Sequence, residues 1–134
     1  MNPVSIISIV LIHSQATTHI TAHDLTGTWV SHGKIADSTW TFGPKNRFIG
    51  EGRTVHDGKV FIFHSDGTYI VKGDVIHVKS RNEWTVKGSV KTTLQAKDFD
   101  SIIAWMNSLQ FKSDLGLIFR KQLPASPKPK GHAN

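Results

Sequence analysis

Apolar and polar residues alternate along most of the chain between Leu25 and Gln122, and turn-forming residues interrupt the alternation about every eight to twelve positions. A period of two places successive side chains on opposite faces of a β-strand, so one face can be buried while the other is solvated. Closing a meander of such strands removes its unpaired edges. The pattern therefore predicts an all-β fold, a single antiparallel up-and-down β-barrel of about eight to ten strands.

Eight segments carry this alternation and are expected to be strands. They are 27–31, 38–42, 47–52, 59–64, 68–72, 75–79, 84–96 and 116–121. Three dipeptides that tolerate positive φ predict tight hairpin turns, namely Asp57–Gly58, Asp66–Gly67 and Gly73–Asp74. The longest segment, 84–96, places Trp84 and Leu94 on one dry face, and its length requires a bend, for which Gly88 is the natural position.

Residues 98–109 break the alternation. Phe99, Ile102, Ile103 and Met106 have the spacing of one helix face, and Asp98 is a suitable N-cap, so the pattern predicts one short helix near 98–109. The alternative is a further strand, with Ile103, Trp105, Leu109 and Phe111 facing inward and Ser113–Asp114 turning into the last strand.

The two ends of the chain differ from its body. Residues 4–12 are apolar apart from two serines, and small residues follow at the spacing a signal peptidase prefers, which predicts a signal peptide over 1–16 and a secreted or periplasmic protein. A buried N-terminal strand is the alternative. Residues 124–134 hold three of the five prolines and predict a disordered tail. The barrel domain is thus expected over 17–123.

Composition narrows the classes of function. A length of 134 residues suits one domain, and no apolar run is long enough for a membrane-spanning helix, so we expect no stable membrane insertion. The absence of cysteine excludes disulfides, thiolate metal sites and thiol nucleophiles. The formal net charge of +6 permits acidic partners, including an acidic protein. Oligomeric state cannot be inferred from these features.

Polar motifs give little support for catalysis, metal binding or nucleic-acid binding. The chain holds eight histidines, but His56, His64 and His77 lack the usual metal-ligand spacing, so no metal site is predicted. Lysines 72, 79, 87, 91 and 97 alternate with inward-facing residues and indicate a solvated sheet face; the aromatic residues fall mainly on the other face, so no nucleic acid is expected. Known nucleophile, phosphate-loop and zinc-helix motifs are missing from the sequence.

The first predicted strand contains Gly27-Thr28-Trp29, and Arg120 lies near the end of the last strand. In these positions, and in a second tryptophan at Trp40, the chain resembles the lipocalin-like (calycin) superfamily, and in particular short bacterial lipocalin-like domains. The resemblance covers roughly residues 25–122. It implies structural roles for Gly27, Trp29 and Arg120, with the arginine closing the barrel base by a cation–π contact to Trp29. The chain lacks the cysteines of longer secreted lipocalins, so the resemblance does not specify a ligand.

A set of large aromatic residues is the candidate ligand-binding lining. Its members are Trp40, Phe42, Phe48, Phe61, Phe63, Tyr69, Trp84 and Phe111. Such residues can line an apolar cavity that holds one small molecule, or they can fill the interior as a packed core. The sequence does not distinguish the two arrangements.

These features favour a non-catalytic binding protein for a small hydrophobic or amphipathic molecule, with an anionic group favoured by the positive net charge and with no cofactor. One alternative is a secreted protein-binding or inhibitor-type module that uses the loops 43–46 and 53–59 for contact. Another is a barrel isomerase or cyclase, for which Tyr69, Glu51 and His64 are the first candidate catalytic residues.

Overall fold

The computed structural model describes residues 20–34 and 36–123. The signal peptide expected over 1–16 and the tail expected over 124–134 lie outside the described residues. Within the described part, the short elements are α2 (Ala22–Leu25) and the 3₁₀ turn η1 (Pro44–Asn46). The strands are β1 (Gly27–His32), β2 (Ala36–Gly43), β3 (Arg47–His56), β4 (Lys59–Lys72), β5 (Val75–Lys87), β6 (Val90–Leu94), β7 (Phe99–Met106), β8 (Gln110–Ser113) and β9 (Ile118–Lys121).

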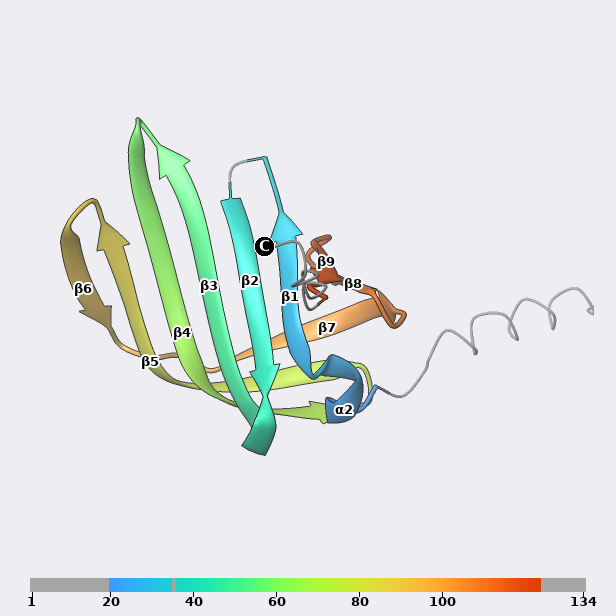
Figure 1. Ribbon diagram of the computed structural model, residues 1–134. Coiled ribbons are helices and arrows are strands. Elements are labelled where there is room, and N and C mark those ends of the chain that lie inside the picture. Colours follow the sequence, from blue (N-terminus) through green and yellow to red (C-terminus); the bar gives the residue numbers. More distant parts are fainter. Residues whose placement is uncertain (1–19, 35, 124–134) are drawn as a thin grey trace, which may run out of the picture.

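The strands form one antiparallel sheet that closes on itself (Figure 1). Their order is β4-β3-β2-β1-β9-β8-β7-β5-β6, and a further pairing of β4 with β5 closes a barrel of eight strands. The ninth strand, β6, extends the sheet beyond the upper half of β5. The predicted all-β class and the antiparallel barrel are therefore confirmed.

Each of the eight barrel strands contributes at least one hydrophobic side chain to a single core at the closed end of the barrel. The buried members are Leu25, Trp29, Phe42, Phe48, Tyr69, Ile76, Val78, Ile103, Phe111 and Phe119. Most of them alternate with outward-facing residues, as the period of two requires. Burying one such side chain contributes about 1.5–3 kcal/mol, so this cluster is the main source of stability.

The two longest strands change partner along their length. The lower part of β5 pairs with β7 at Val75–Val78, whereas its upper part pairs with β6 at Glu83–Lys87. A register shift between Asp66 and Gly67 in β4 separates the two parts. The two strands approach so closely there that a Cβ atom on Gly67 would lie 2.0 Å from the carbonyl oxygen of Lys79. The shift thus divides a closed base from an open upper sheet.

The tips of two hairpins lie at the open end of the sheet. In Figure 1 the tips of the β3–β4 and β5–β6 hairpins lie at the end opposite α2. Two predicted turns are confirmed, because Asp57 and Gly58 have φ of 51° and 74° and Gly73 has φ of 62°. The turn predicted at Asp66–Gly67 is wrong, because both residues lie inside the continuous strand β4.

Two other predicted elements differ from the structure. The single strand expected over 84–96 is a hairpin, in which β5 ends at Lys87 and β6 begins at Val90. The turn reverses the alternation, so Trp84 and Leu94 lie on opposite faces of the sheet. The helix expected near 98–109 is instead the strands β7 and β8, with a turn between them at 107–109. The alternative of a further strand is closer to the structure, but Trp105 and Leu109, which it placed facing inward, are 41% and 51% exposed. The described residues include no helix long and apolar enough to cross a membrane.

Candidate functional site

The closed end of the barrel is filled by its own aromatic side chains. Trp40 lies at the centre of this cluster, and its ring centroid is 4.5 Å from that of Phe119 and 5.8 Å from that of Phe48. The rings of Phe111 and Phe119 stack at 4.8 Å. Of the predicted lining residues, Trp40, Phe42, Phe48, Tyr69 and Phe111 all belong to or pack against this core. In the closed end, the packed arrangement is therefore the one observed.

A small cavity opens directly above the aromatic cluster, where the sheet begins to spread. We call it the mouth pocket; its volume is about 110 Å³. Its lining consists of Ser38, Trp40, Phe48, Gly50, Glu51, Gly52, Phe63, Ser65 and Phe99. These residues come from β2, β3, β4 and β7, so the barrel walls themselves form the pocket. The aromatic rings provide an apolar floor, and Ser38 and Ser65 lie on the walls, with the Ser65 hydroxyl group hydrogen-bonded to that of Ser80 at 2.8 Å.

Glycines in β3 make room for this arrangement. A Cβ atom on Gly50 would lie 2.9 Å from the Cζ atom of Phe48, so the phenylalanine ring occupies the space that a side chain would need. A Cβ atom on Gly52 would meet only the carbonyl oxygen of Asp37, at 3.8 Å. Gly52 therefore leaves an open position on the pocket wall.

Above the pocket, the same face of the sheet continues to the hairpin tips. Phe63 and Phe61 follow Ser65 along β4 on this face, and 41% of Phe63 is exposed to solvent. The Nζ atom of Lys87 lies 5.3 Å from the ring centroid of Phe61. The face thus runs from buried rings, through a partly exposed phenylalanine, to a cation at the rim.

Trp84, which was predicted to line the ligand-binding cavity, lies on the opposite face of the sheet from the mouth pocket. Its ring stacks on that of His64, with centroids 4.5 Å apart and planes 7° apart, and the Nζ atom of Lys91 lies 4.6 Å from the ring. Both Trp84 and His64 face outward, because they alternate with the inward-facing Thr85 and Ser65. The assignment of Trp84 to the pocket lining is therefore not supported by its position.

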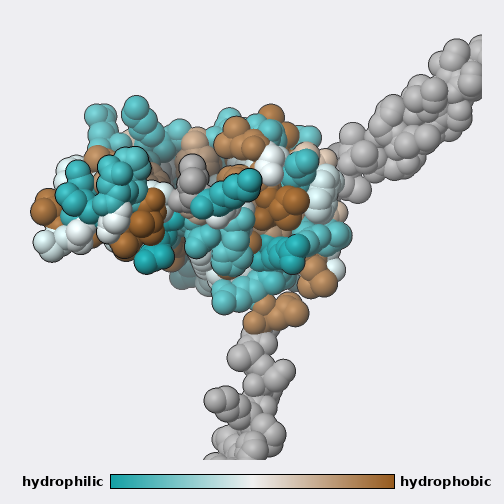
Figure 2. Space-filling model, turned by 90° about the horizontal axis from the view of Figure 1, so that it is seen from above, coloured by the Kyte–Doolittle hydropathy of each residue, from teal (hydrophilic) through white to brown (hydrophobic). Residues whose placement is uncertain are grey.

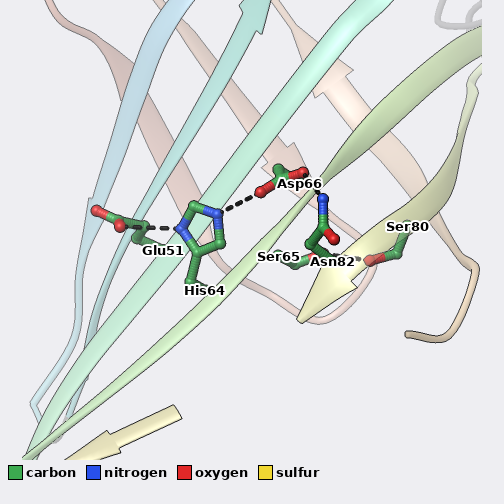
Figure 3. A network of polar contacts seen from close by, with 6 residues as sticks. All are labelled: Glu51, His64, Ser65, Asp66, Ser80 and Asn82. Carbon is green, nitrogen blue, oxygen red and sulfur yellow. Dashed lines mark hydrogen bonds and ion pairs between the residues drawn. The ribbon is translucent and has the colours of Figure 1, made fainter. Parts of the chain in front are cut away.

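On this outer face, two carboxylates flank His64 (Figure 3). Its Nε2 atom is 2.6 Å from Asp66 Oδ2, and its Nδ1 atom is 3.1 Å from Glu51 Oε2. Asp66 also accepts a hydrogen bond of 2.9 Å from the side-chain amide of Asn82. Only a doubly protonated imidazole can donate to both carboxylates. These four residues, which we call the histidine clasp, join β3, β4 and β5.

Burial tends to raise the pKa of the Asp66 carboxyl group. The hydrogen bonds from Asn82 and His64, together with the positive charges of His64 and Arg47, outweigh this effect and hold that pKa below its usual value. Asp66 therefore remains ionised and serves as an acceptor.

The three candidate catalytic residues do not converge. Tyr69 points into the core, where burial raises the pKa of its hydroxyl group, whereas Glu51 and His64 interact with each other on the outer face. Because both ring nitrogens of His64 already face carboxylates, the ring has no free nitrogen to act as a base. No group of three or more histidine, aspartate or glutamate residues within the described ranges could hold a metal ion.

Gly27, Trp29 and Arg120, the residues predicted to have structural roles, lie at the barrel base. Gly27 has φ of 127°, and Trp29 is fully buried and donates a hydrogen bond of 2.7 Å to the Leu25 carbonyl in α2. The cation near Trp29 is Lys121, whose Nζ atom lies 5.6 Å from the ring centroid. Arg120 pairs with Val30 and faces outward, so the contact assigned to Arg120 is wrong by one position.

Several larger grooves lie on the described part of the chain, and the two with the greatest volumes do not share a lining residue with the mouth pocket. One, of about 450 Å³, lies beside α2 and includes Ile20, the first described residue, and Lys121. The other, of about 420 Å³, runs along β4 and β5 past the hydrogen-bonded pair His77–Asp100, whose Nδ1 and Oδ1 atoms are 2.7 Å apart. The lining of the second groove combines the polar side chains of His77, Lys79 and Asp100 with the apolar side chains of Ile70 and Val78. Neither groove has the aromatic floor of the mouth pocket.

The sequence did not indicate Ser38, Gly50, Gly52, Ser65 or Phe99 as site residues. The only available signal was Gly50-Glu51-Gly52, in which two glycines share one face of a predicted strand. Comparison with protein-family models, curated proteins and solved structures found no match.

Proposed function

We propose that the chain is a non-catalytic binding protein for a small amphipathic, anionic molecule, and that the site is the mouth pocket and the sheet face above it. The observation that supports this most is the gradient along that face, from the rings of Trp40 and Phe48 to the ammonium group of Lys87. A tail can bury apolar surface against the rings while its charged head lies at the rim. Export to a secreted or periplasmic location belongs to the same proposal and rests on residues 4–16 of the sequence.

The length of the sheet face above the pocket limits the size of the proposed ligand. Ser65 lies at the pocket and Phe61 lies four residues along β4 at the rim, a span of about 13 Å for an extended strand. Each methylene group buried in this span contributes about 0.8 kcal/mol. Affinity should therefore rise with tail length until the tail reaches the aromatic floor, and then stop rising.

The test titrates the protein with straight-chain alkyl carboxylates of increasing length, and binding is measured by the change in tryptophan fluorescence. Trp40 is the expected reporter, because it lines the pocket, whereas Trp84 lies outside it. Replacing Gly52 by Leu would project a side chain into the pocket and should weaken binding about tenfold or more. The matched control is Arg53→Leu, which adds the same side chain on the neighbouring, exposed position of β3.

Alkyl ammonium and alkyl alcohol compounds of the same lengths test the head group. Lys87→Gln should weaken binding of the carboxylates more than binding of the alcohols, because it removes the rim charge but leaves the apolar face. The proposal is wrong if no chain length binds, or if Gly52→Leu and Arg53→Leu bind equally well.

A further inference from the structure

The strand β6 presents an unpaired edge. Among the described residues its one neighbour in the sheet is β5, and all five of its residues are exposed. In an antiparallel strand, every second residue directs its N–H and C=O groups away from the existing partner. Such an edge can accept one more strand. Five residues provide a template of about 17 Å.

Both faces of this edge strand offer side-chain contacts as well. Val90 and Leu94 lie on the same sheet face as Phe63, and they are 63% and 37% exposed. On the outer face, the Nζ atom of Lys91 lies 4.6 Å from the ring centroid of Trp84 in β5, so the ammonium group does not cover the free backbone edge of β6. An added strand would therefore meet apolar side chains on one face and a cation on the other.

Positive charge surrounds the free edge of β6 and favours an acidic binding partner. Residues 79–97 contain five cationic side chains, Lys79, Arg81, Lys87, Lys91 and Lys97. The one anion in this segment, Glu83, is buried and accepts a hydrogen bond of 2.8 Å from the backbone N–H of Lys97. Viewed from the hairpin tips, hydrophilic side chains surround scattered hydrophobic patches (Figure 2). A second copy of the chain would bring the same positive charges together, which opposes pairing of β6 with itself.

We propose that β6 binds an acidic polypeptide segment in an extended conformation, which adds to the sheet as a further strand. Backbone hydrogen bonds along β6 provide the register. Apolar residues of the segment pack on Val90 and Leu94, and its carboxylates lie near Lys91 and the neighbouring cations. This interaction surface is separate from the mouth pocket and does not depend on a ligand there.

The probe is a labelled peptide of about ten residues in which glutamate alternates with valine or threonine. Binding to the full-length protein is followed by fluorescence anisotropy, and hydrogen exchange of the backbone amides at 90–94 locates the contact. We expect saturable binding, slower exchange in β6, and weaker binding as salt is raised. A peptide with lysine in place of glutamate should not bind.

Charge reversal at Lys91 should reduce the affinity about tenfold, because an attraction becomes a repulsion. The control is Lys72→Glu, since Lys72 is also exposed but lies beside the Gly73 turn at the opposite end of β4. Two N-methylated peptides test the backbone pairing. In one peptide, methyl groups replace the hydrogens of the alternate amides that face β6, and this peptide should not bind. In the other, they replace the hydrogens of the amides that face away from β6, and binding should be largely intact.

Equal binding of the acidic and basic peptides would overturn the proposal, as would equal loss from the two methylation patterns. Lys91→Glu and Lys72→Glu proteins that bind the peptide alike would also overturn it. A dimer in sedimentation equilibrium, with protected 90–94 amides in the absence of peptide, would mean that a second copy occupies the edge. Gly52→Leu should not affect the peptide, so failure of the ligand proposal is distinguishable from failure of this one.

Discussion

At the residue scale, the base of the barrel gives a direct test of one contact. The Nζ atom of Lys121 lies 5.6 Å from the ring of Trp29, whereas Arg120 faces the other side of β9. A partly exposed cation–π pair contributes about 0.5–1 kcal/mol. In denaturant unfolding, Lys121→Ala and Trp29→Phe should therefore show a coupling free energy of about that size.

The control cycle pairs Arg120→Ala with Trp29→Phe, and its single effects should add. Coupling in the Arg120 cycle but not in the Lys121 cycle would contradict the observed geometry. The resemblance implied that Arg120 packs on Trp29, but the adjacent cations Arg120 and Lys121 differ only in strand parity. That parity depends on where β9 begins, and the turn at 114–117 that sets it has no strong sequence signal.

At the element scale, the histidine clasp joins three strands beside the register shift. Because the pKa of Asp66 is held below its usual value in the folded protein, its ionised form stabilises the fold above about pH 4. That stabilisation should be lost as the pH falls through the folded-state pKa. The free energy of unfolding lost on Asp66→Asn should therefore be largest near neutral pH and shrink in acid.

Urea titrations of both proteins at several pH values measure this difference. Asp74→Asn is the matched control, since Asp74 is exposed in the two-residue turn between β4 and β5. A destabilisation by Asp66→Asn that stays constant from neutral pH to about pH 3 would contradict the role of the carboxylate.

The elements that the sequence predicted well are those with strict alternation and a glycine turn, such as the β3–β4 hairpin at Asp57–Gly58. The helical spacing of Phe99, Ile103 and Met106 was misleading. Phe99 and Ile103 face inward as members of a strand, and a register shift after Ile103 lets Met106 face inward too. A shift that inserts a residue changes the period locally, so it resembles a helical repeat over one or two turns. The hairpin within 84–96 was missed because its turn, Gly88-Ser89, falls in phase with the alternation.

The candidate site was predictable in part. Trp84, which was expected to face inward, faces outward, whereas Trp40, Phe48 and Phe63 line the mouth pocket. Whether rings enclose a space or fill it depends on their packing in three dimensions, which alternation does not encode. The five rings around Trp40 fill the closed end, and the mouth pocket lies above them, where Gly52 leaves an open position on the wall.

At the scale of the whole molecule, closure depends on one short strand. β9 joins β1 to β8, and its Phe119 is fully buried against the core. A chain truncated after Asp114 loses this strand and exposes two sheet edges and the void left by Phe119. We expect it to lose cooperative thermal unfolding and near-ultraviolet circular dichroism.

The control truncation ends after Leu123 and retains every described strand. It should unfold cooperatively, with a midpoint within a few degrees of that of the full chain, because a change of about 1 kcal/mol shifts the midpoint by roughly 4 °C. If the shorter truncation unfolded at the same temperature as this control, β9 would have no role in closure.

The register shift at Asp66–Gly67 also has a consequence for engineering. It separates a base whose aromatic side chains depend on one another from two hairpins whose tips, at Asp57–Gly58 and Gly88–Ser89, contribute no residue to the core. Foreign sequence inserted at these tips would project from one end of the molecule, away from the residues that fold the base. The chain is in this respect a display scaffold with two insertion sites, in which the inserted sequences and the hydrophobic core can be changed separately.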